Sequence, residues 1–143
     1  MSRLLLDSGP LGKLCKAKPR LDILQWQDSL LLAGWTMILP EITDFEIRRN
    51  LILENKTESL AELDRLKSFY VYQPITTTAM LKAAELWADA RRRGKPTADP
   101  KELDGDVILA VMAIESKAIV ATENVGHLSR YVPAKHWSAI VAA

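Results

Sequence analysis

Short apolar runs alternate along the chain with longer stretches whose apolar residues recur every three or four positions. The short runs end in turn residues, as Arg3–Asp7 ends at Ser8-Gly9-Pro10, and they predict buried strands. The longer stretches predict helices. Strands are expected at Arg3–Asp7, Trp35–Leu39, Phe69–Gln73, Ala118–Ala121 and, at the sheet edge, Trp137–Val141. Helices are expected at Leu21–Gly34, Glu41–Asn55, Thr57–Ser68, Thr76–Arg93 and Leu103–Ser116, with a polar loop at Thr97–Glu102 and a short turn or helix at Val125–Tyr131.

Strands separated by helices predict an α/β protein with a parallel sheet covered on both faces. The chain has no internal repeat and no linker-like stretch, and its 143 residues fit one domain spanning 1–143. Ligands of such sheets bind outside the carboxyl ends of the strands. The residues that follow Leu6 and Ala121 are therefore the first candidates for a functional site.

Composition narrows the classes of function. Lys and Arg number 19 against 18 Asp and Glu, a formal net charge of +1, so a polyanion would need a local patch or a bound cation to attract it. Cys15 is the single cysteine, which excludes an internal disulfide and a Cys-rich zinc site, and two histidines are too few for a His-based metal site. Asp7 interrupts the first leucine run, and no apolar run approaches roughly 18 residues. We therefore expect a soluble cytoplasmic protein without a signal peptide or membrane span.

Four carboxylates interrupt apolar surroundings. Asp7 ends the first predicted strand, and Asp104 and Asp106 open the most hydrophobic predicted helix. Glu46 follows Ile42 by four residues, so it points toward the covered side of its helix. The inward stripe of that helix is predicted to be Ile42, Phe45, Arg49 and Ile52.

Each of these acids also has a purely structural interpretation. Asp7 could begin a turn through an Asx hydrogen bond, and Glu46 could pair with Arg49 or Asn50. One of Asp104 and Asp106 could cap the helix that follows, although a single cap does not explain both. Burying several like charges together costs several kcal/mol unless something compensates, and the usual compensator for an all-oxygen cluster is Mg²⁺ or Mn²⁺. Such ions typically serve phosphodiester chemistry.

Four stretches of the chain resemble, in order and at normal spacing, the motifs of PIN-domain ribonucleases of the VapC toxin type. The resemblance covers nearly the whole chain. It departs at Gly9, where the family usually has Asn, and at Asn124, where many members have Asp. These departures predict a weaker metal site or one that holds a single ion. The four stretches are Leu5–Leu11, Ile42–Leu51, Leu103–Ala110 and Val120–Leu128.

The resemblance implies a three-layer α/β/α sandwich whose central parallel sheet has four to five strands. It also implies Mg²⁺- or Mn²⁺-dependent cleavage of single-stranded RNA, a co-encoded antitoxin that silences the site, and a homodimer. The implied catalytic residues are Asp7, Glu46, Asp104 and Asp106, with Asp7, Glu46 and Asp106 as metal ligands and Asp104 as an auxiliary one. In this mechanism the ion polarises the phosphate and lowers the pKa of a bound water that attacks phosphorus. Possible auxiliary residues are Ser8, Thr122, Asn124 and, if its loop turns it inward, Glu123.

RNA contacts are expected from local positive charge near the first motif, at Lys13 and Lys16. Arg91–Arg93 are interpreted as cations at a helix end. Ser8 and Thr122 have local turn bonding as an equal alternative. Helix-end or surface roles are expected for His127 and His136. The tryptophans are interpreted as core or partner-interface anchors rather than base-stacking surfaces. These are Trp26, Trp35, Trp87 and Trp137.

Two other classes of protein compete with the nuclease interpretation. The first is a binding or scaffold module with the same fold and an eroded fourth motif. The second is a receiver-like signalling domain, which needs a second acid beside Asp7 and a lysine soon after Ala118–Ala121. The sequence has neither, so the binding module is the stronger alternative.

Overall fold

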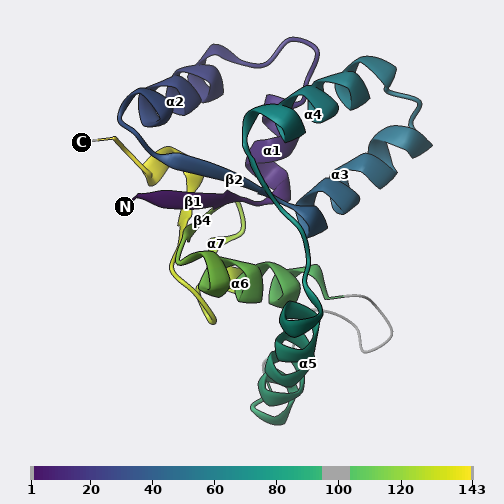
Figure 1. The fold of residues 1–143 in the computed structure, drawn as a ribbon, viewed down its shortest axis with the longest axis vertical. Helices are drawn as coiled ribbons and strands as arrows, with labels where there is room; N and C mark the ends of the chain where they lie inside the picture. The colour runs from purple at the N-terminus through teal and green to yellow at the C-terminus, as the bar shows by residue number, and fades with distance from the viewer. Residues whose placement is uncertain (1, 95–103, 143) are drawn as a thin grey trace.

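The structure is a computed structural model that describes residues 2–94 and 104–142 (Figure 1). Its centre is a five-stranded sheet in the order β3-β2-β1-β4-β5, in which every neighbouring pair is parallel. The predicted parallel α/β architecture is therefore confirmed. The strands are β1 (Arg3–Leu6), β2 (Thr36–Pro40), β3 (Val71–Gln73), β4 (Ile119–Thr122) and β5 (Ala134–His136).

Helices cover both faces of the sheet, which makes three layers. In Figure 1, α1, α2 and α4 lie on one side of the sheet and α5, α6 and α7 on the other. The described helices are α1 (Ser8–Leu14), α2 (Leu21–Leu32), α3 (Glu41–Leu53), α4 (Thr57–Phe69), α5 (Thr77–Arg92), α6 (Gly105–Ser116) and α7 (Val125–Leu128), with a 3₁₀ turn at Trp137–Ala139. None of these helices is long and apolar enough to cross a membrane.

The central strands bury side chains on both faces, because successive residues of a strand point to opposite sides. Leu4 and Leu6 of β1 pack into the core beneath α1, α2 and α4. Leu5, between them, packs into the second core, against α5 and α6. All three leucines are fully buried, at roughly 1.5–3 kcal/mol of favourable transfer free energy each. The continuous apolar run that predicted a buried strand thus reflects burial on two sides.

The predicted last strand is wrong. The strand at this sheet edge is β5, Ala134–His136, and the chain turns into the 3₁₀ helix at Trp137. The indole of Trp137 packs edge-on against Trp26, with ring centroids 5.5 Å apart, and Trp26 Nε1 donates a hydrogen bond to the carbonyl oxygen of Ile140 at 3.0 Å. The apolar stretch therefore leaves the sheet because its residues bury themselves against α2.

Two further differences concern helices. The sequence Ser8-Gly9-Pro10 predicted a turn, but it forms the first turn of α1, where a proline costs no hydrogen bond because the first N–H groups have no partner within the helix. In α3 the buried residues are Ile42, Thr43, Asp44 and Ile47, whereas Phe45 and Ile52 are exposed.

The predicted stripe of α3 fails because this helix sits at the end of the sheet. Ile42 contributes to one core and Ile47 to the other, so the covered face is rotated from the one that apolar spacing indicates. The loop predicted at Thr97–Glu102 and the first residue of the helix predicted at Leu103–Ser116 lie outside the described residues.

Candidate active site

The connections that leave the carboxyl ends of β1 and β4 run in opposite directions across the sheet, from β1 to β2 and from β4 to β5. The strand β1 has β2 on one side and β4 on the other, which is the kind of position where parallel sheets bind ligands. Asp7 follows β1 and is 8% exposed, and Thr122 ends β4 fully buried. The hydroxyl of Thr122 donates to Asp7 Oδ2 at 2.7 Å, and the backbone N–H of Ser8 donates to Asp7 Oδ1 at 2.8 Å. Asp7 is therefore held in one orientation and also caps α1.

Glu46 reaches the same place from the second turn of α3. The hydroxyl of Thr43, one turn earlier, donates to the carbonyl oxygen of Leu6 at 2.9 Å and so fixes the start of α3 against the end of β1. The carboxylate of Glu46 lies against Gly105, where a Cβ atom would stand 2.6 Å from Glu46 Oε2. Glycine at 105 therefore leaves the space that Glu46 occupies.

The four acids interact electrostatically. Burial, together with the negative charges of Asp7 and Asp106, raises the pKa of Glu46 from 4.5 to about 7, against the lowering effect of Arg49. Burial also raises the pKa of Asp106, with Asp7 and Asp104 acting in the same direction. The fold thus brings together all four acids that the sequence singled out.

Asp104 and Asp106 have different local environments at the start of α6. Asp104 is the N-cap, and its Oδ1 accepts a hydrogen bond from the backbone N–H of Val107 at 3.3 Å. Asp106 lies in the first turn and is not needed as a cap. The capping interpretation therefore explains Asp104 and leaves Asp106 to the acid cluster, which hereafter means Asp7, Glu46, Asp104 and Asp106.

His127 lies beside the acid cluster in α7, with a side chain that is 45% exposed, which agrees with the helix-end or surface role expected from the sequence. His127 Nδ1 lies 3.5 Å from Asp106 Oδ2 and 3.0 Å from Asn124 Nδ2. His127 also lowers the pKa of Asp106, against the effect of burial. The signal for this position was the segment after β4, because it begins at the same sheet edge as Asp7. Both contacts use the same ring nitrogen, which can donate to Asp106 or accept from the Asn124 amide but not both at once.

Glu123 is directed elsewhere. Its Oε1 lies 3.1 Å from Lys13 Nζ, and its carboxylate covers Gly9, where a Cβ atom would stand 2.7 Å from the same oxygen. The glycine that departs from the family motif is therefore the residue that accommodates Glu123. Lys13, one of the two predicted phosphate contacts, is engaged in this ion pair, and Lys16 is exposed on the surface.

The acid cluster is not a preformed ligand cage. Within residues 2–94 and 104–142, no three His, Cys, Asp or Glu side chains are arranged as a ready metal site. The donor chemistry nevertheless fits a hard divalent cation, because the gathered groups are carboxylates whose mutual repulsion and burial already raise two of their pKa values. A cation would stabilise the charged forms of these groups.

Comparison with known proteins identifies the fold. No protein-family model matches the sequence, and no curated protein matches it. Among solved structures, a chain of VapBC2 from Rickettsia felis bound to a DNA fragment from its promoter is similar with a TM-score of 0.75 and 17% identity, over 93% of this chain and 97% of that one. VapBC-1 from nontypeable Haemophilus influenzae gives 0.74 and 19%, over 95% and 98%, and FitAcB from Neisseria gonorrhoeae gives 0.68 and 22%, over 96% and 99%. The chain therefore has the PIN-like α/β/α fold, as the sequence motifs predicted.

Proposed function

We propose that this protein is a metal-dependent endoribonuclease that cleaves phosphodiester bonds of single-stranded RNA. The observation that carries the proposal is the gathering of the acid cluster from three segments at the carboxyl ends of β1 and β4, where burial and the neighbouring acids raise the pKa of Glu46 to about 7. Such a cluster is costly in a metal-free protein and useful in a nuclease.

In this proposal Asp7, Glu46 and Asp106 hold a Mg²⁺ or Mn²⁺ ion, with Asp104 assisting. When bound, the ion supplies charge stabilisation at the phosphate and a nucleophilic water of lowered pKa. The protein itself orients the carboxylates. Thr122 and the N–H of Ser8 fix both oxygens of Asp7, and the cap formed by Asp104 fixes the first turn of α6, which carries Asp106.

The same proposal includes the biological setting. The structural neighbours are VapBC and FitAB complexes, which supports a role as the toxin of a type II toxin–antitoxin pair with a cognate antitoxin. We further propose that the toxin acts in the cytoplasm as a homodimer.

The substitution Asp7→Asn tests the chemistry. It removes the charge but keeps one oxygen to accept a hydrogen bond, so we expect the fold to survive and cleavage to fall at least about 100-fold. Cleavage of a panel of single-stranded RNAs is measured with Mn²⁺ and with EDTA. The matched control is Glu54→Gln, an exposed acid at the end of α3 that leaves the acid cluster unchanged.

Two results would contradict the proposal. Wild-type cleavage that persists in EDTA would exclude the metal ion, and cleavage by Asp7→Asn at the wild-type rate would exclude the acid cluster.

A second candidate function is a PIN-fold binding module without cleavage. It is favoured by the uncharged Asn124 after β4 and by the engagement of Glu123 with Lys13 away from the acid cluster. Titration with Mn²⁺ separates the two functions, because a nuclease site should raise the unfolding temperature at millimolar Mn²⁺. A binding module with an eroded site should show no shift.

A further inference from the structure

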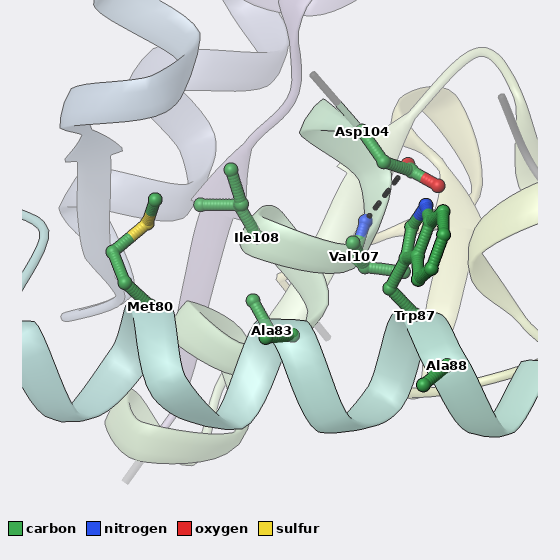
Figure 2. Close-up of a pocket in the computed structure, with 8 residues that line it drawn as sticks. Met80, Ala83, Trp87, Ala88, Asp104, Val107 and Ile108 are labelled. Atoms are coloured by element: carbon green, nitrogen blue, oxygen red, sulfur yellow. Dashed lines mark hydrogen bonds between the residues drawn. The ribbon is translucent and has the colours of Figure 1, made fainter. Parts of the chain in front are cut away.

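A groove between α5 and α6 opens directly beside the acid cluster. Its volume is about 420 Å³, within the range of small-molecule sites, and its walls are mostly apolar. Trp87 of α5 forms one wall and Met80 extends it, while Val107 and Ile108 of α6 lie opposite. Figure 2 shows the indole of Trp87 beside the carboxylate of Asp104. Since Asp104 belongs to the acid cluster, the groove and the proposed catalytic site are continuous.

Trp87 differs from the other tryptophans in its surroundings. Trp26 and Trp137 are buried against each other, and Trp35 packs against the same core. These three are core anchors, as the sequence indicated. Trp87 instead lines an open groove, and its ring carries the guanidinium of Arg91 at 4.4 Å from the ring centroid.

Positive charge collects at the end of the groove that holds Trp87 and Asp104, where α5 ends. Arg91 and Arg92 form its last turn, and Arg93 is the C-cap, whose side chain is 70% exposed although it pairs with Asp89. Arg93 and Arg130 line a separate cavity of about 230 Å³ that shares no lining residue with the groove. The groove thus has Asp104, Trp87 and Arg91 at one end and apolar walls that extend toward Met80.

This arrangement matches the chemistry of single-stranded RNA. Unpaired bases stack on aromatic rings and guanidinium planes, and their exocyclic amino groups donate hydrogen bonds to carboxylates. Backbone phosphates bind arginine. An apolar peptide would fit the walls of the groove but would make no use of the arginines at its end.

We propose that the groove between α5 and α6 binds a base of the RNA substrate, with Trp87 as the stacking surface and the arginines at the end of α5 as contacts for its backbone. This inference rests on the proposed ribonuclease function and names the part of the substrate held beside the acid cluster. Trp87 is a substrate-binding residue, and the acid cluster acts on the neighbouring phosphodiester bond.

The test is RNA binding by the full chain in EDTA, measured by fluorescence anisotropy with a labelled 12-nucleotide single-stranded RNA. We expect Trp87→Ala to weaken binding about tenfold or more and Trp87→Phe to retain most of the affinity, because phenylalanine still stacks. The matched control is Leu81→Ala, an exposed apolar residue of α5 outside the groove, which should bind like the wild type. Unfolding temperatures confirm that each variant is folded.

An abasic strand of the same length separates stacking from charge. The effect of Trp87→Ala should disappear on this strand, because it has phosphates but no bases. Unchanged RNA affinity in Trp87→Ala, as expected if the groove receives a peptide, would overturn the inference, and so would an equal loss on the abasic strand. Wild-type protein that binds RNA but never cleaves it would remove the ribonuclease function, whereas normal cleavage and binding by Trp87→Ala would remove only the base site.

Discussion

At the scale of single residues, two glycines make room for carboxylates. A side chain at Gly105 would collide with Glu46, and one at Gly9 would collide with Glu123. Neither glycine has a left-handed backbone, so the requirement is space rather than conformation. The positions of both carboxylates therefore depend on the absence of a side chain at these two residues.

Gly105→Ala should displace Glu46 without unfolding the protein. Its new Cβ would stand 2.6 Å from Glu46 Oε2, and the carboxylate can move because it ends a flexible side chain. Alanine also favours a helix by roughly 0.5–1 kcal/mol. We expect RNA cleavage to fall at least about tenfold while the unfolding temperature stays the same or rises.

The control for this prediction is Gly12→Ala. Gly12 lies in α1, and a Cβ atom there would meet no atom within 4 Å. Its cleavage rate should stay at the wild-type value. Equal rates for the two alanine variants would show that the position of Glu46 does not matter.

At the scale of elements, α3 is positioned by one buried hydrogen bond. Thr43 is fully buried and its hydroxyl donates to the carbonyl oxygen of Leu6 at 2.9 Å. Because Glu46 lies on the next turn of the same helix, this bond also sets the distance of Glu46 from Asp7. A helix that shows weak apolar periodicity is thus placed by a polar contact.

Thr43→Val should loosen α3 at the end of β1. Valine has nearly the shape of threonine but leaves the Leu6 carbonyl without this donor, at a cost of about 1–3 kcal/mol in the free energy of unfolding. Urea denaturation measures the loss. Thr43→Ser keeps the hydroxyl and should recover most of the difference in stability from the valine variant, and a serine variant as unstable as the valine one would exclude this explanation.

At the scale of the whole molecule, the fold assembles negative charge that no single element carries. Asp7 follows β1, Glu46 lies in α3, and Asp104 and Asp106 begin α6. Burial makes their charge costly, and together the acids also repel one another. The free energy of unfolding of the metal-free protein should therefore depend on pH through this cluster.

The pKa of Glu46 is about 7 in the folded protein, above its ordinary value of 4.5, so the folded state binds this proton more tightly than the unfolded state. The resulting stability is fully present below pH 4.5 and is lost as the pH rises through 7. In EDTA, Glu46→Gln should remove this pH dependence. The free energy of unfolding of this variant, taken relative to that of the wild type, should rise by about 1–2 kcal/mol from pH 5 to pH 8, after allowance for solvent screening.

Urea denaturation of both proteins at pH 5 and pH 8 checks this prediction, with Glu54→Gln as the exposed control. Identical pH profiles for the wild type and Glu46→Gln would contradict it. Millimolar Mg²⁺ should narrow the difference at pH 8, because a bound cation stabilises the charged carboxylate.

The amino-acid pattern alone predicted the strands β1, β2, β3 and β4, most of the helices and the four candidate acids, because these features depend on local periodicity and on charges that interrupt it. Leu4–Leu6 show this well: a run that is apolar at every position must be covered on both faces, and helices must supply the cover.

Which distant residues meet depends on how the elements pack in the folded protein. The strand order places Thr122 against Asp7 and brings His127 to Asp106, although 115 positions separate the first pair. It also turns Glu123 toward Lys13 and draws Trp137 out of the sheet toward Trp26. Local periodicity specifies the faces of an element, whereas these contacts depend on the free energy of packing whole elements together, which no single stretch of sequence records.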